Sequence, residues 1–158
     1  MAEIRTNLVS VIGGASADQE DVSWAERLGE LLADSGFTVI CGGGTGVMEA
    51  VCRGIAFKGG HSIGILPGSS PLEANRWVET VIVTGMGTSR NRIIALSGDV
   101  AVAVGGMYGT LSEIAYALQA GKPVCATGKW AGIDGVVPVS SPEDALDFII
   151  KNTEGDLC

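Results

Sequence analysis

The stretch Phe37-Thr38-Val39-Ile40-Cys41-Gly42-Gly43-Gly44-Thr45-Gly46-Val47-Met48-Glu49-Ala50 decides the fold. Its first five residues form an apolar run of strand length, and the glycine cluster opens a segment of helical period that reaches Phe57. A strand that passes through a glycine loop directly into a helix is typical of parallel α/β proteins, which bind ligands at the edge where such loops lie. The stretch therefore predicts an architecture and the place of a binding site.

Short apolar runs and longer helical segments alternate along the whole chain. Further strands are predicted over residues 8–12, 62–66, 77–83, 100–104 and 124–127, and further helices over 19–35, 88–97, 109–120 and from Ser141 onward. Residues 100–104 are apolar throughout, which is typical of a strand buried on both faces. We expect one Rossmann-like domain over residues 1–158, with an open, mainly parallel sheet and helices on both faces.

Charge and composition exclude several classes of partner. The 158 residues carry ten Lys and Arg against eighteen Asp and Glu, a net charge of −8, which repels a nucleic-acid backbone or an anionic membrane. The amino-terminal sequence does not resemble a signal peptide, and no apolar run has the length of a membrane span. We therefore expect a cytoplasmic protein that binds neither nucleic acid nor membrane.

Cysteine and histidine usage speaks against a metal centre. Cys41, Cys52, Cys125 and Cys158 form no C-x-x-C pair, and His61 is the only histidine. This pattern predicts reduced, mostly buried thiols and no zinc site. His61 comes just before a predicted strand, and we expect it at the sheet edge opposite the ligand.

Four glycine-rich loops follow predicted strands, at 13–16, 42–46, 85–90 and 105–110. Glycine allows the backbone to approach a ligand closely, and the amides at the start of a helix attract anions. One such loop would only suggest a tight turn, but four at one edge predict a phosphate-bearing ligand. The candidate binding residues are Gly13, Gly14, Ser16, Gly42, Gly43, Gly44, Thr45, Gly46, Met86, Thr88, Ser89, Asn91, Gly106, Met107, Tyr108, Gly109 and Thr110.

Two common phosphate-binding motifs are missing. The chain contains no Gly-Lys-Ser or Gly-Lys-Thr, so a nucleoside-triphosphate loop is excluded. The spacing Gly42-x-Gly44 is not completed to a dinucleotide fingerprint, which disfavours NAD. Trp130 and Tyr108 offer aromatic faces on which a purine or pterin ring can stack, although packing is the commoner role of such residues.

Residues 41–50, 84–91 and 108–113 together resemble the Lonely Guy superfamily, long labelled "putative lysine decarboxylase". The resemblance covers essentially the whole chain, and it is greatest to the short bacterial branch that also contains the molybdenum cofactor carrier proteins. Decarboxylation through pyridoxal phosphate is not expected, because no lysine lies in the four glycine loops.

The resemblance implies a reaction and its residues. Cytokinin-activating members of the superfamily cleave the N-glycosidic bond of a nucleoside 5′-monophosphate. Their signature P-G-G-x-G-T-x-x-E falls on 105–113, with Gly105 in place of proline and Met107 in place of a glycine. Their signature R-K-x-x-M falls on 90–94, where the arginine is kept and the lysine is Asn91.

By this resemblance Arg90 and Glu113 are the catalytic pair. Glu113 would stabilise the oxocarbenium charge that develops on the ribose, and Arg90 would orient it, without a metal or cofactor. The plainer interpretation is a carboxylate in the first turn of a helix with its salt-bridge partner. Two functions stay open: a phosphoribohydrolase, and a non-catalytic carrier of the molybdenum cofactor, a phosphorylated pterin. Met107 could fill or reshape the loop and so favours the carrier.

The chain is more hydrophobic than a soluble monomer of its size requires. Its mean hydropathy is +0.35, and the predicted helical segments 92–96 and 111–118 are rich in apolar residues. Subunit contacts would bury such surfaces, and we expect a homodimer or homotetramer.

Overall fold

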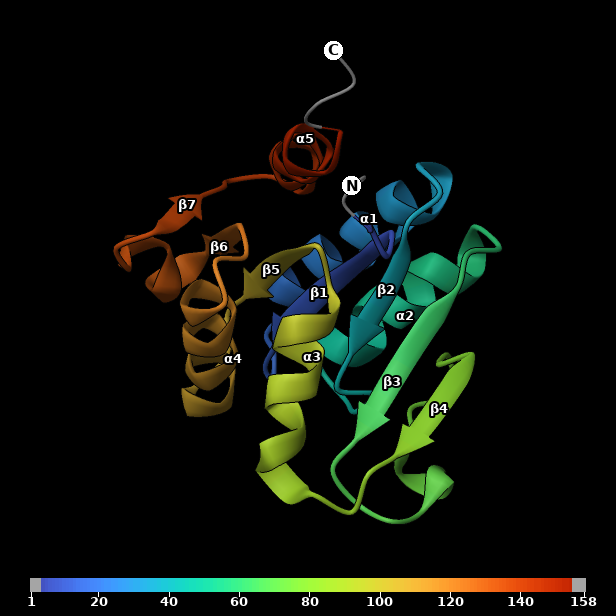
Figure 1. The fold of residues 1–158 in the computed structure, drawn as a ribbon. Coiled ribbons are helices and arrows are strands. Elements are labelled where there is room, and N and C mark those ends of the chain that lie inside the picture. Colours follow the sequence, from blue (N-terminus) through green and yellow to red (C-terminus); the bar gives the residue numbers. More distant parts are fainter. Residues whose placement is uncertain (1–3, 155–158) are drawn as a thin grey trace.

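The computed structural model describes residues 4–154, which form a seven-stranded, entirely parallel sheet with helices on both faces (Figure 1). The strand order is β4-β3-β2-β1-β5-β6-β7. The predicted fold class is confirmed. The strands are β1 Leu8–Gly13, β2 Thr38–Cys41, β3 Ser62–Leu66, β4 Thr80–Val83, β5 Val100–Val104, β6 Val124–Thr127 and β7 Val136–Pro138.

Two helical layers cover the sheet. The α-helices are α1 Gln19–Asp34, α2 Val47–Phe57, α3 Asn91–Ser97, α4 Tyr108–Gln119 and α5 Pro142–Thr153, and the short 3-10 helices are η1 Pro71–Glu73, η2 Gly87–Arg90 and η3 Gly128–Gly132. Helices α1, α2 and α5 pack together on one face, and α3 and α4 pack together on the other (Figure 1).

The central strand β5 shows why this sequence needs both layers. All five of its residues are buried. Val100, Val102 and Val104 belong to the core beneath α1, α2 and α5, whereas Ala101 and Ala103 belong to the core beneath α4. Because side chains alternate between the faces of a strand, a continuous apolar run demands a helix layer on each side.

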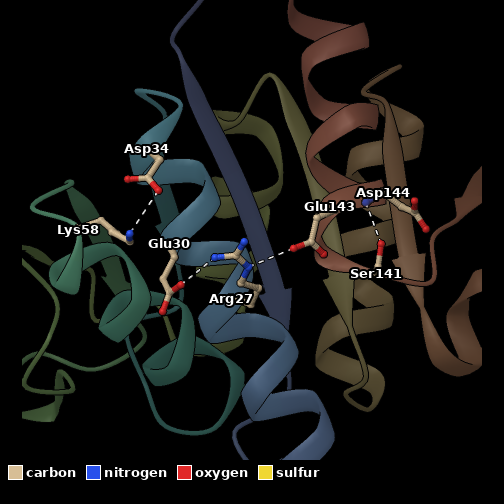
Figure 2. Close-up of polar contacts among 7 residues, drawn as sticks. All are labelled: Arg27, Glu30, Asp34, Lys58, Ser141, Glu143 and Asp144. Carbon is tan, nitrogen blue, oxygen red and sulfur yellow. Dashed lines mark hydrogen bonds and ion pairs between the residues drawn. The ribbon is translucent and has the colours of Figure 1, made fainter.

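Polar contacts join the helices of the first layer at their surface (Figure 2). Arg27 of α1 pairs with Glu30 in its own helix and with Glu143 of α5, at 3.1 Å in each case. Lys58, just after α2, pairs with Asp34 of α1 at 3.5 Å. These side chains are solvent-exposed in large part, so the pairs orient the helices and add little to stability.

The larger differences from the predicted elements lie at three places, while β1, β2, α1 and α4 differ from the prediction by single residues. The fourth strand was predicted over 77–83 but begins at Thr80, because Trp77 packs against the core and its amide donates to the side chain of Asn75. The helix predicted over 88–97 begins as the 3-10 turn η2, and α3 has no side-chain cap. The short strand β7 was not predicted. The last helix begins where it was predicted, directly after Ser141, whose Oγ caps α5 by accepting from the amide of Asp144.

Cysteines and the histidine lie largely where they were predicted. Cys41, Cys52 and Cys125 are free and buried, and Cys158 lies outside the described residues. His61 lies at the amino-terminal edge of the sheet, where its side chain contacts Thr80 and Glu79. Within residues 4–154, no helix is both long and apolar enough to cross a membrane.

Candidate functional site

The candidate site lies where the order of the strands in the sheet reverses, between β1 and β5. From β1 the chain moves to β2 on one side, and from β5 it moves to β6 on the other, although β1 and β5 are neighbours. In parallel α/β sheets, the diverging loops at such a point leave a crevice that binds ligands. Here those loops carry Gly13-Gly14 and Gly105-Gly106. A Cβ atom on Gly14 would lie 2.9 Å from the carbonyl oxygen of Ser16 and 3.2 Å from the Cα of Gly106, so glycine helps the two loops to pack closely.

The loop between β2 and α2 joins the same cluster. The amide of Val47 donates to the carbonyl of Gly14 at 3.0 Å, and the hydroxyl of Thr45 donates to the carbonyl of Ala15 at 2.8 Å. Gly46 has φ +68 and lies directly against the backbone of Gly14 and Ala15, where a side chain has no room. Three of the four predicted glycine loops therefore meet at one place.

The helices that follow these loops differ in their attraction for an anion. Helix α1 is capped by Asp18 and carries Glu20 and Asp21 in its first turn, and burial, reinforced by the two neighbouring carboxylates, raises the pKa of Asp21. Helix α4 begins at Tyr108, its N-cap residue Met107 makes no side-chain capping bond, and its first turn has no acidic residue. Because free amides and the helix dipole attract negative charge, the start of α4 is the more favourable phosphate position.

The fourth loop brings Arg90 into the cluster. Its Nε donates to the carbonyl of Ile65 at the end of β3, at 2.9 Å, and a terminal nitrogen donates to Oδ1 of Asn91. A Cβ atom on Gly42 would lie 2.7 Å from Nη2 of Arg90. Burial lowers the pKa of the guanidinium, and the nearby Glu113 opposes that effect.

Glu113 lies in the second turn of α4 and is only 7% exposed. Burial raises its pKa to about 8, and the charge of Arg90 offsets only part of that rise. Among the described residues, no ion pair or hydrogen bond joins Glu113 to Arg90. The two predicted catalytic residues are thus electrostatic neighbours, but the structural salt bridge considered from the sequence does not form.

The remaining predicted residues divide into an exposed rim and a buried support. Met86, Met107 and Tyr108 are 48%, 62% and 77% exposed, so they are accessible to a ligand. Asn91 is 3% exposed, and its amide donates to the hydroxyl of Ser112 at 3.3 Å. Further members are Thr88, Ser89, Ser16 and Gly109, which are exposed, and Thr110, which is buried.

Asn91 and Thr110 support the loop from below. The hydroxyl of Ser112 donates to the carbonyl of Gly109 at 2.6 Å, so Asn91 is linked through Ser112 to the start of α4. Gly106, with φ +85, lies directly over the side chain of Thr110. These two residues therefore hold the loop that opens α4 from its buried side. That they bind the ligand remains a prediction.

Met107 does not fill the loop, contrary to the expectation from its replacing a glycine. Its φ of −118 and ψ of −144 need no glycine, and its side chain points outward. The sulfur atom contacts the ammonium of Lys129, on η3, at 3.1 Å. Lys129 was not among the binding residues predicted from the sequence. Gly128, directly after β6, could have indicated a further turn at the carboxyl edge of the sheet.

Glycine loops gathered at the switch point of a parallel sheet define a nucleotide-binding type of α/β fold. The chain belongs to the SLOG cluster4 family, whose profile matches residues 6–154. A protein of Archaeoglobus fulgidus with no stated function is 41% identical over 145 residues, which cover 92% of this chain and 95% of the relative.

Two solved structures are similar over their full length. The molybdenum cofactor binding protein of Rippkaea orientalis is 37% identical, with a TM-score of 0.87 and coverage of 93% of this chain and 97% of the other. The molybdenum cofactor carrier protein of Chlamydomonas reinhardtii is 33% identical, with a TM-score of 0.85 and coverage of 93% and 98%.

The chain is also similar to a hydrolase of the Lonely Guy type, but over a smaller part of both sequences. The probable cytokinin riboside 5′-monophosphate phosphoribohydrolase of rice is 34% identical over 93 residues, which cover 57% of this chain and 38% of the relative. The resemblance found in the sequence is therefore confirmed.

Proposed function

We propose that this protein binds the molybdenum cofactor, a phosphorylated pterin, at the carboxyl edge of its sheet and holds it without chemical change. The phosphate would lie at the uncapped start of α4, and the pterin would lie against the exposed side chains of Met107 and Tyr108. Both solved relatives reported above are named for molybdenum cofactor binding or carriage, and this chain matches them over nearly their whole length.

The observation that carries the proposal is the backbone of Gly105. Its φ is +54, whereas proline, which the hydrolase signature has at this position, is restricted to φ near −65. The loop of this chain therefore enters α4 along a path that the proline-bearing signature cannot follow. A hydrolase that places its phosphate with that signature would need a different backbone here.

The state of Glu113 supports the same conclusion. Burial raises the pKa of this carboxyl to about 8, which favours its protonated form at neutral pH. A neutral carboxyl gives little electrostatic stabilisation to a developing oxocarbenium ion. A protein that only holds its ligand does not need a charged carboxylate at Glu113.

Phosphoribohydrolase activity is the second candidate, and one observation favours it. Arg90 and Glu113, the pair implied by the resemblance, lie near enough for the guanidinium to lower the pKa of the carboxyl. A positive charge that develops on a substrate beside Glu113 would favour the ionised carboxylate.

One experiment compares the two functions directly. The purified protein is incubated with molybdenum cofactor, and the pterin that co-elutes after gel filtration is measured by fluorescence. In parallel, a panel of nucleoside 5′-monophosphates is followed by mass spectrometry for free base and ribose 5-phosphate. A carrier retains the pterin and releases no base.

Two variants test whether any base release depends on Glu113. Base release that disappears in Glu113→Gln, but persists in the exposed control Glu154→Gln, would establish the hydrolase. Failure to retain the pterin would remove the carrier proposal.

We also propose that the protein forms a homo-oligomer through α3. Ile93 and Leu96 on that helix are 37% and 38% exposed, and Ile82 and Val83 on the edge strand β4 are 45% and 44% exposed. Partly exposed apolar side chains of this kind are typical of a subunit interface.

A further inference from the structure

Lys129 reaches the proposed phosphate position from a different strand. Strands β5 and β6 pair in parallel, with Val104 opposite Thr127, so the loops that follow them leave the sheet side by side. Gly128, with φ +74, turns the chain directly after β6. The next residue is Lys129, which this turn places beside the loop that opens α4.

The ammonium of Lys129 is held in place but its charge is not neutralised. Nζ lies 3.1 Å from Sδ of Met107 and 4.7 Å from the centre of the Trp130 ring. A thioether is a weak acceptor, and an aromatic face compensates only part of a full positive charge. Within residues 4–154, Lys129 forms no ion pair with a carboxylate.

The neighbouring groups favour an anion at this point. Met107, which the ammonium contacts, is also the N-cap residue of α4, and it makes no side-chain capping bond. The positive end of the helix dipole and the lysine charge therefore lie together, in a chain whose net charge is −8. The guanidinium of Arg90 is less free to serve, because it already donates to the carbonyl of Ile65 and to Asn91.

A second donor beside the lysine is also without a partner. Nε1 of Trp130 is the buried side-chain polar atom that, among the described residues, makes no hydrogen bond. A buried donor without an acceptor is energetically unfavourable. The residue that follows Lys129 in the chain therefore carries a buried donor whose hydrogen-bonding capacity is unused.

We propose that Lys129 is a ligand-binding residue of this site and that its ammonium binds the phosphate of the ligand at the start of α4. The inference rests on the proposed function for the place of the site, and it adds the side chain that recognises the phosphate. The alternative role for Lys129 is to cover the ring of Trp130, which would affect folding but not phosphate recognition.

The first test separates the phosphate from the rest of a ligand. AMP and adenosine are titrated calorimetrically into the wild type, Lys129→Met and Lys122→Met. Lys122 is the matched control, since it lies before β6 at the opposite edge of the sheet. We expect Lys129→Met to weaken AMP binding about tenfold and to leave adenosine binding unchanged, with no effect of Lys122→Met. Equal AMP affinity in the wild type and Lys129→Met would overturn the proposal.

A second readout needs no nucleotide binding. The lysines, at positions 58, 122, 129 and 151, are methylated with ¹³C-formaldehyde, and their NMR signals are followed during titration with inorganic phosphate. The Lys129 signal, assigned by its loss in Lys129→Met, should shift and saturate while the other three signals do not.

The two readouts also separate this inference from the proposed function. No saturable shift of the Lys129 signal would reject the inference, even if the pterin is retained. A saturable shift without retention of the molybdenum cofactor would leave the phosphate site in place and reject the carrier function.

Discussion

Gly42 and Arg90 lie in direct contact at the end of β2. A Cβ atom on Gly42 would lie 2.7 Å from Nη2 of the arginine and at the same distance from Sδ of Met48. The guanidinium is fixed on its other side by the carbonyl of Ile65. The missing side chain of Gly42 therefore leaves the space that the guanidinium occupies.

Gly42→Ala should displace Arg90 and weaken ligand binding. The new methyl group and the guanidinium cannot both keep their places, and the carbonyl of Ile65 limits how far the guanidinium can move. We expect at least a tenfold loss of affinity for the retained pterin, measured by calorimetry, at a cost in stability of about 1–3 kcal/mol. Gly132→Ala is the control, since nothing lies within 4 Å of the position of its Cβ. Equal affinity in both variants would show that the position of Arg90 is irrelevant to binding.

The pKa of Glu113 predicts how stability depends on pH. The folded-state pKa of about 8 is above the ordinary value of 4.5, so the folded protein holds a proton that the unfolded chain releases. Stability should therefore fall as the pH rises from about 4.5 to 8 and become level above that. In Glu113→Gln this contribution disappears, and the variant should be more stable than the wild type at pH 8 by the order of a few kcal/mol.

Chemical denaturation between pH 4.5 and 9 tests this dependence. Glu154→Gln, an exposed substitution after α5, should follow the wild-type curve. A Glu113→Gln curve parallel to that of the wild type would show that the carboxyl is ionised in the folded protein. An ionised Glu113 would in turn support the phosphoribohydrolase function.

The sequence predicted most of the fold because buried parallel strands have an obvious pattern. The bounds of β3, β5 and β6 agree with the prediction residue for residue, since each is a short apolar run between glycine, proline or polar residues. Strand β7 was missed because three residues ending in proline resemble a turn.

The site was only partly predictable for a different reason. The glycine loops mark the backbone of the cradle, and their gathering at one edge follows from the parallel strands. The raised pKa of Glu113 depends on burial by the surrounding structure, which its place near the start of a helix does not reveal. Lys129 lies on a neighbouring loop without a recognisable motif, and only the register of β5 with β6 brings it to Met107.

Ser10 should be important for the position of α3. It is fully buried on β1, its hydroxyl donates to the carbonyl of Ile94 at 2.6 Å, and it accepts from the amide of Gly98 at 3.1 Å. Ser10→Ala leaves both backbone groups unsatisfied, and we expect a loss of about 1–3 kcal/mol in urea denaturation. Ser69→Ala, at an exposed position, should change stability by less than about 0.5 kcal/mol. Equal midpoints for the two variants would contradict this account.

The proposed oligomer predicts the effect of charge on α3. Ile93→Lys combined with Leu96→Lys places two ammonium groups on side chains that are only 37% and 38% exposed in the single chain. If α3 lies in a subunit interface, these charges lose their water and repel their copies, so the assembly should dissociate. Light scattering should then give the 16.1 kDa of one chain, whereas the wild type gives a multiple of it. Leu72→Lys, at a residue that is 93% exposed on η1, should leave the assembly intact. A wild type of 16.1 kDa would remove the oligomer, and dissociation by Leu72→Lys instead would move the interface to η1.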